Sequence, residues 1–376
     1  MQTKAATNNV KKLHELGQSV WLDDISRQMI QAGDLQKAID EIGIRGVTSN
    51  PTIFQKAIAG GTAYDADIKA LLAEGKDPAE VFQTVAVKDI QDACDILRPI
   101  YDESGGEDGF VSIEVLPSLA RDTEGTLENA RVLWKAVDRP NLMIKVPGTK
   151  EGEPAIRTLL TEGINVNITL LFSLQNYEAV ARAYIDALKA RHENGLPVDH
   201  VASVASFFVS RVDTLADKKI DEKIAAGEGD AEVLKGLKGK VAVANAVLAY
   251  ELFEKLFSSP EFKELADAGA KVQRPLWAST GTKNPKYPDT LYVDTLIGPH
   301  TINTAPGKTI EAFLDHGTVK RTVDADYAAA HKVLDDLEAQ GISLDEITAQ
   351  LEDEGIASFM TSYDDLLEGV AAKREQ

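Results

Sequence analysis

The feature that most constrains this chain is the alternation of short apolar runs with helical segments along most of its length. Eight runs are rich in β-branched or aromatic residues and end at glycine, proline or polar residues, which predicts strands. They cover residues 19–25, 44–51, 110–117, 141–148, 164–172, 200–208, 275–280 and 291–297. Strands that alternate with helices form parallel sheets covered by helices. We therefore predict an α/β fold, a (β/α)8 barrel with additional N- and C-terminal helices.

An open, doubly wound sheet is the alternative fold. It usually carries a glycine-rich nucleotide loop after its first strand, and the Trp-Leu-Asp-Asp-Ile-Ser stretch at 21–26 has no such loop. The sequence shows no internal repeat, low-complexity tract or linker. We expect a single barrel domain over residues 1–376, with the terminal helices decorating it.

Composition narrows the range of functions that the chain can have. The net charge of −20 disfavours nucleic acid and anionic membranes as partners. The single cysteine, Cys94, excludes an intrachain disulfide and, with an N-terminus that lacks an apolar signal region, suggests the cytoplasm. The six histidines show no metal-ligand spacing, and neither a P-loop nor a G-x-S-x-G motif occurs. We expect no metal and no organic cofactor.

Residues 141–148, Asn-Leu-Met-Ile-Lys-Val-Pro-Gly, are the most informative stretch. They read as a buried strand with Lys145 near its C-terminal end. An unpaired ammonium loses hydration in an apolar interior, so burial favours the neutral amine that a nucleophilic lysine needs. The alternative is a structural lysine that reaches water or pairs with a carboxylate.

Other polar residues fall near the ends of the predicted strands, where barrel enzymes place their chemistry. Singly, each has a structural explanation: Asn50 as a turn residue, Asp24 as a helix cap, Glu114 as a partner for Lys145. Two carboxylates in a barrel also fit a glycosidase, which the low aromatic content of 6% disfavours. Together the set indicates one active site: Asp23 or Asp24, Asn50, Glu114, Lys145, Asn167, Thr169, Ser206 and Ser279.

Five segments together resemble the transaldolase family of the pentose phosphate pathway. They occur in family order and span most of the chain: GVTSNPTIF (46–54), SIEV (112–115), MIKVPGT (143–149), INVNITLLFS (164–173) and SFFVSRVD (206–213). The resemblance implies a barrel of the class I aldolase type with its Schiff-base lysine on the fourth strand. Strand counting places Lys145 on the fourth strand as well.

The resemblance also implies a role for each matching residue. Lys145 would form a Schiff base with a ketose phosphate. Asp23 would be the acid/base, with Asp24 as the alternative if the register slips. Glu114 and Thr169 would hold the water of carbinolamine dehydration. Asn50 and Asn167 would bind the dihydroxyacetone hydroxyls.

For the phosphate, the resemblance implies a grip by Ser206 and Arg211 with Phe208 between them. The plain alternative is a surface arginine paired with Asp213 or Asp217. After the seventh predicted strand many family members have a serine closely followed by arginine. Here Ser279 fits, and the second cation would be Lys283. The polar residues of 295–306 could line the mouth of the barrel or shape a turn, and we favour the turn.

Two other functions remain open. One is a lyase of the fructose-6-phosphate aldolase type, which the long terminal helices disfavour because such lyases are much shorter. The other is a non-catalytic barrel that binds sugar phosphates or a protein. The oligomeric state is open between monomer and homodimer.

Overall fold

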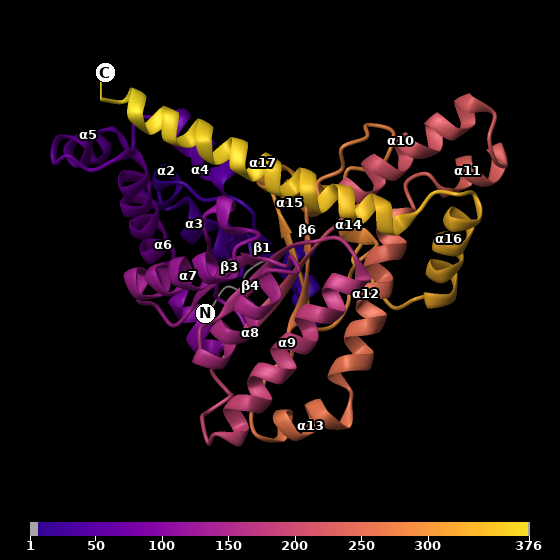
Figure 1. Cartoon of the computed structure of the whole chain (residues 1–376), viewed down its shortest axis with the longest axis horizontal. Coiled ribbons are helices and arrows are strands. Elements are labelled where there is room, and N and C mark those ends of the chain that lie inside the picture. Colours follow the sequence, from indigo (N-terminus) through magenta and orange to yellow (C-terminus); the bar gives the residue numbers. More distant parts are fainter. Residues whose placement is uncertain (1–6, 375–376) are drawn as a thin grey trace.

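The computed structural model describes residues 7–374, in which seven parallel strands form one sheet (Figure 1). In space they follow the order β1-β7-β6-β5-β4-β3-β2, so neighbours in the chain are also neighbours in the sheet. The strands are β1 (Gln18–Leu22), β2 (Val111–Glu114), β3 (Leu142–Pro147), β4 (Val166–Leu171), β5 (Ser203–Phe208), β6 (Arg274–Ala278) and β7 (Thr301–Ala305).

The ring is closed between β1 and β2 by residues 45–48, which correspond to the second predicted strand. Val47 forms parallel bridges to Leu22 on one side and to Val111 on the other. Its N–H donates to the carbonyl of Phe110, and the N–H of Thr48 donates to the carbonyl of Leu22, both at 2.9 Å. With this short segment as an eighth strand the sheet makes a (β/α)8 barrel, as predicted. Counted along the chain, Lys145 lies on the fourth strand of that barrel.

The eighth predicted strand is wrong. Residues 291–297 begin with helix α14 (Leu291–Asp294), and the last strand is β7, inside the segment that we expected to be a turn. Buried residues in this region recur with a helical spacing, Tyr292 and Val293 followed by Leu296 and Ile297. That spacing matches a period of 3.6 rather than the period of 2 of a half-buried strand. The apolar residues of 291–297 therefore indicate a helical turn and not a strand.

Helices cover the outside of the barrel and its ends. Several boundaries agree with the sequence, including the predicted cap of α9, where the Ser173 hydroxyl accepts from the N–H of Asn176. The helices are α1 (Asn9–Glu15), α2 (Arg27–Gln31), α3 (Asp34–Lys37), α4 (Pro51–Ala59), α5 (Asp65–Ala73), α6 (Pro78–Glu103), α7 (Thr123–Val137), α8 (Gly152–Glu162), α9 (Leu174–Glu193), α10 (Ser210–Ala226), α11 (Ala231–Leu237), α12 (Val241–Phe257), α13 (Pro260–Asp267), α15 (Gly307–His316), α16 (Tyr327–Ala339) and α17 (Leu344–Ala372), with short turns η1 (Ala38–Ile42) and η2 (Pro117–Leu119).

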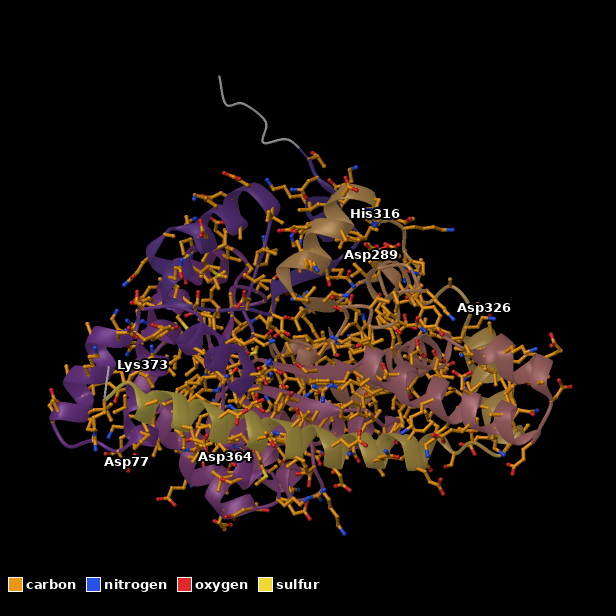
Figure 2. The ribbon with its side chains drawn as sticks, turned by 90° about the horizontal axis from the view of Figure 1, so that it is seen from above. Asp77, Asp289, His316, Asp326, Asp364 and Lys373 are labelled. Carbon is orange, nitrogen blue, oxygen red and sulfur yellow. The ribbon has the colours of Figure 1, made fainter. Side chains whose placement is uncertain are left out.

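Helix α17 is the longest and runs along the C-terminal end of the barrel (Figures 1 and 2). It packs mainly on α4, and also on α6, α10, η2 and β4. Hydrogen bonds fasten it at several points, among them Thr52 with Ser362 and Asn176 with Glu352. No helix within residues 7–374 is long and apolar enough to cross a membrane.

Candidate active site

Three of the predicted residues lie at one level on adjacent strands. In the parallel register Glu114 of β2 is paired with Lys145 of β3, and Lys145 is paired with Asn167 of β4. Residues at one level of neighbouring strands project to the same face of a sheet. The barrel therefore places a carboxyl, an amine and an amide side by side at its C-terminal end.

Lys145 is buried, with its side chain 5% exposed. Its Nζ donates to the carbonyl oxygen of Ser49 at 3.1 Å and lies 3.5 Å from Glu114 Oε2. The 3.5 Å separation is longer than an ordinary N–H···O hydrogen bond. The amine is therefore held in place mainly by a neutral carbonyl, with the carboxyl group beside it.

Glu114 and Thr169 have unused hydrogen-bonding capacity. Neither carboxyl oxygen of Glu114 nor the Thr169 hydroxyl has a hydrogen-bond partner among the described residues, although all three atoms are buried. Burial raises the pKa of the Glu114 carboxyl, and the charge of Lys145 opposes that rise. A protonated Glu114 beside Lys145 is compatible with a neutral amine, which a carboxylate at that place would disfavour.

Of the two neighbouring aspartates, Asp23 is the one on which the charge of Lys145 acts. Its carboxylate accepts from the Thr48 hydroxyl at 2.7 Å, whereas Asp24 is exposed. Burial raises the pKa of Asp23, while the charge of Lys145, the Thr48 hydrogen bond and the charge of Lys283 lower it. Helix α2 is capped by Ser26, so the predicted alternative of Asp24 as the cap is wrong.

The two asparagines have different surroundings. Asn50 caps α4, and its side-chain oxygen accepts from the N–H of Ile53 at 3.0 Å. Asn167 is fully buried, donates to Ser112 Oγ at 3.0 Å and accepts from the Ser206 hydroxyl at 2.7 Å. The Asn167 amide is thus oriented by two hydroxyl groups, one on the adjacent strand β5 and one on β2, beyond β3.

Arg211 lies in the first turn of α10, and its guanidinium group has no anionic partner within residues 7–374. Its guanidinium lies over the Phe208 ring, 5.5 Å from the centroid, and has no ion pair or hydrogen bond within residues 7–374. Burial lowers its pKa, and only the charge of Glu354 raises it. The alternative pairing is wrong, because Asp213 accepts from Tyr292 at 2.7 Å and Asp217 accepts from Tyr287 at 2.5 Å.

The loop after β6 brings the remaining candidates. Ser279 has a left-handed backbone with φ 55°, and its hydroxyl is 2.9 Å from that of Ser210 at the start of α10. Lys283 is exposed and lines a hollow with Asp217 and Tyr287. Ser279 therefore lies beside the turn that carries Arg211, whereas Lys283 stands farther out.

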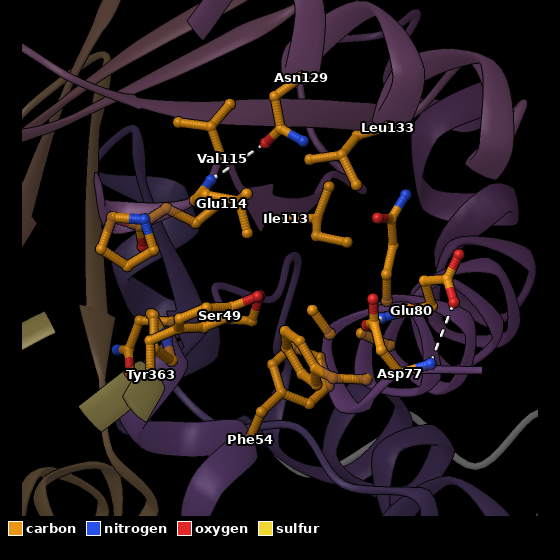
Figure 3. A pocket seen from close by; sticks show the side chains of 18 residues that line it. Ser49, Phe54, Asp77, Glu80, Ile113, Glu114, Val115, Asn129, Leu133 and Tyr363 are labelled. Atoms are coloured by element: carbon orange, nitrogen blue, oxygen red, sulfur yellow. Dashed lines mark hydrogen bonds between the residues drawn. The ribbon is translucent and has the colours of Figure 1, made fainter. Parts of the chain in front are cut away.

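A cavity of about 150 Å³ opens beside this site (Figure 3). Ser49 and Glu114 form its wall on the side of the barrel, and Phe54 and Tyr363 line it from α4 and α17. Most of its lining is apolar. The cavity thus gives Glu114 an apolar flank, which is the environment that raises a carboxyl pKa.

Several contacts of the site escaped the sequence analysis. The carbonyl of Ser49 holds Lys145, and Thr48 links Asp23 to Thr304 of β7 through hydroxyl contacts of 2.7 and 2.6 Å. Thr48 and Ser49 stand inside the GVTSNPTIF segment, where only Asn50 was selected. Thr304 was not predicted, because residues 295–306 were expected to form a turn. The pattern Thr-Ile-Asn-Thr-Ala before Pro306 is nevertheless typical of a strand.

Comparison with known proteins gives one consistent result. A family model described as Transaldolase/Fructose-6-phosphate aldolase matches residues 20–370. A relative named Transaldolase from Trichodesmium erythraeum (strain IMS101) is 47% identical over 371 residues, which is 98% of both chains. One from Thermobifida fusca (strain YX) is 50% identical over 96% of this chain and 97% of its own. One from Mycobacterium tuberculosis (strain ATCC 25618 / H37Rv) is 48% identical over 98% of both.

Proposed function

Since the chain belongs to the transaldolase/fructose-6-phosphate aldolase family, we propose that it is a transaldolase. It moves a dihydroxyacetone unit from sedoheptulose 7-phosphate or fructose 6-phosphate to glyceraldehyde 3-phosphate or erythrose 4-phosphate. The observation that carries the proposal is Lys145, a buried amine flanked by Glu114 and level with Asn167 at the C-terminal end of the barrel.

The first stage is Schiff-base formation. The Lys145 amine attacks the C2 ketone of the donor and gives a carbinolamine, which loses water to become an iminium. Glu114 and Thr169, whose buried oxygens have no protein partner within residues 7–374, hold that water and supply the proton for its departure. No metal or organic cofactor takes part in these steps.

The second stage is carbon–carbon cleavage. The Asp23 carboxylate takes the proton of the C4 hydroxyl, the C3–C4 bond breaks, and its electron pair flows into the iminium to form a neutral enamine. An aldose phosphate leaves as the other product. The same carboxyl group returns the proton to the oxygen of the acceptor aldehyde when the new bond forms. Asn50 and Asn167 bind the hydroxyls of the three-carbon unit that stays on the enzyme.

Arg211 binds the substrate phosphate, with Ser206, Phe208 and Ser279 around it and Lys283 as an outer cation. A guanidinium pairs with two phosphate oxygens at once, and Arg211 has no competing carboxylate within 4 Å among the described residues. A local cation is necessary here because the chain has a net charge of −20 and repels phosphates in general.

Borohydride reduction in the presence of fructose 6-phosphate, followed by peptide mass mapping, tests the function. We expect a reduced dihydroxyacetone adduct on Lys145 and none in the Lys145→Met variant. Erythrose 4-phosphate then distinguishes transferase from lyase, because a transferase releases sedoheptulose 7-phosphate and little free dihydroxyacetone. A folded protein that gives no adduct on any lysine contradicts the Schiff-base mechanism and favours a non-catalytic barrel.

The proposal extends to the setting of the reaction. Small sugar phosphates are the partners, without nucleic acid or membrane. A cytoplasmic location fits a chain whose single cysteine, Cys94, is a free thiol buried in the core.

A further inference from the structure

The residue after Thr169 has an unusual backbone. Leu170 has φ 57°, in the left-handed region, at an irregularity of β4. Ile168 pairs with Ala205 and Leu171 with Phe207, so two residues of β4 stand opposite one residue of β5. This is a β-bulge, a device that redirects side chains next to active sites. A bulky residue in such a conformation is strained and persists only when its surroundings hold it.

Helix α17 supplies those surroundings. The side chain of Leu170 is buried and lies against Gly355, which is itself buried in the middle of α17. A Cβ atom added to Gly355 would be 2.9 Å from Leu170 Cδ2 and 3.7 Å from Arg211 Nη1. The first distance is too short for real atoms, so the end of the buried Leu170 side chain would have to shift, whereas the second is an ordinary contact. The missing side chain of Gly355 therefore matters for Leu170 far more than for Arg211.

A glycine at this place has a cost. Inside a helix it is less favourable than alanine. Gly369, on the same helix, has nothing within 4 Å of an added Cβ and so has no such packing reason. Glu352 accepts a hydrogen bond from Asn176, and Ser362 is hydrogen-bonded to Thr52, so α17 is fixed on either side of Gly355 and cannot retreat easily from Leu170.

We propose that Gly355 is a positioning residue for the reaction: its bare backbone lets α17 pack on Leu170 and so holds the bulge that aims Thr169 into the site. The inference rests on the proposed function for its catalytic consequence. Because Thr169 acts in carbinolamine dehydration, displacing it slows turnover and leaves donor binding through Arg211 largely intact.

The test compares Gly355→Ala and Gly355→Val with Gly369→Ala as the matched control. We expect Gly355→Val to lower kcat about ten-fold, since displacements of 1 Å in a site can cost 10²-fold. Gly355→Ala should have a smaller effect in the same direction. For Gly355→Ala the KM for fructose 6-phosphate should stay within about two-fold, because the added Cβ would be at an ordinary contact distance of 3.7 Å from Arg211 Nη1. Gly369→Ala should keep wild-type kinetics.

A double-mutant cycle with Leu170→Ala locates the effect. Residues that act through one shared contact are non-additive, so Gly355→Val with Leu170→Ala should be no slower than the slower single variant. Crystal structures of the Gly355 variants should show the backbone of 169–171 displaced, a readout that does not depend on activity. If Gly355→Val does not fold, Gly355→Ala serves, because alanine favours a helix.

Three outcomes overturn the proposal: wild-type kcat in folded Gly355 variants, an equal loss in Gly369→Ala, or a change confined to KM. A failure of the transaldolase assignment looks different. In that case wild-type protein gives no adduct on Lys145, while the displacement of residues 169–171 in the Gly355 variants is still measurable.

Discussion

Lys145 Nζ lies 3.5 Å from Glu114 Oε2 but 3.1 Å from the carbonyl oxygen of Ser49, so the catalytic candidate is bonded to the backbone and only flanked by its carboxyl neighbour. A close ion pair would hold the amine in its charged form. In the looser arrangement burial raises the pKa of Glu114, which favours its protonated form beside the amine. A protonated Glu114 can supply the proton that dehydration requires.

Glu114→Gln should slow the formation of the trapped adduct by about 10²-fold, because an amide cannot donate the proton that expels water. Since the acid form of Glu114 does the work, the wild-type rate of this step should fall as the pH rises through the raised pKa of Glu114. The variant should lack that decline. Rapid-quench borohydride trapping across pH measures both. Glu128→Gln, an exposed change on α7, is the control and should behave as wild type.

Asp23→Asn and Asp24→Asn form a matched pair of adjacent substitutions. We expect Asp23→Asn to lower kcat by about 10²–10⁴-fold, the range for a lost general base. Schiff-base trapping on Lys145 should persist, because Asp23 acts after that step. Asp24→Asn should stay close to wild type, since Asp24 is exposed. The reverse ranking of the two variants would place the acid/base at Asp24.

Arg211→Ala should raise the KM for fructose 6-phosphate by about 10–100-fold, the value of a lost charge-assisted hydrogen bond. A donor without a phosphate, such as dihydroxyacetone, should be used as before. Lys283→Ala should raise the KM by less than about five-fold, because exposed ion pairs contribute little. Steady-state kinetics with both donors decides the matter, and equal losses on the two donors would argue against a phosphate ligand at Arg211.

The stability of the chain should depend on pH through Asp213. Burial raises the pKa of Asp213 to about 6 in the fold, against an ordinary value of 3.8. Between these values the folded state binds more protons than the unfolded state, so the contribution of this group to stability falls as the pH rises. Asp213→Asn removes that contribution.

The free energy of unfolding of Asp213→Asn minus that of wild type should therefore increase from pH 4 to pH 6 and stay level above it. Urea titrations at several pH values measure the difference. Asp335→Asn, an exposed change on α16 at a residue without a hydrogen bond or ion pair of its side chain within residues 7–374, is the control and should show no such step. A difference that is flat from pH 4 to pH 6 would contradict a raised pKa at Asp213.

Sequence reasoning found what depends on strands and local motifs. Counting apolar runs predicts Lys145 on the fourth strand of the barrel, and the apolar composition of that strand predicts its burial. It failed at 291–297, where an apolar run with helical spacing was predicted to be a strand. It also predicted a full strand at 44–51, where the structure has only isolated bridges at Val47. It could not foresee the contact of Gly355 with Leu170, because the two residues are far apart in the chain and only packing joins them.

The way in which the barrel closes has a consequence for its synthesis. Gln18 of β1 pairs with Thr301 of β7, a separation of 283 residues. Until β7 leaves the ribosome, the growing chain carries an open sheet whose two outer strands lack their partners. Unpaired strands of that kind invite association with other chains. The risk of aggregation is thus concentrated in the nascent chain, and it ends when the residues that complete the ring arrive.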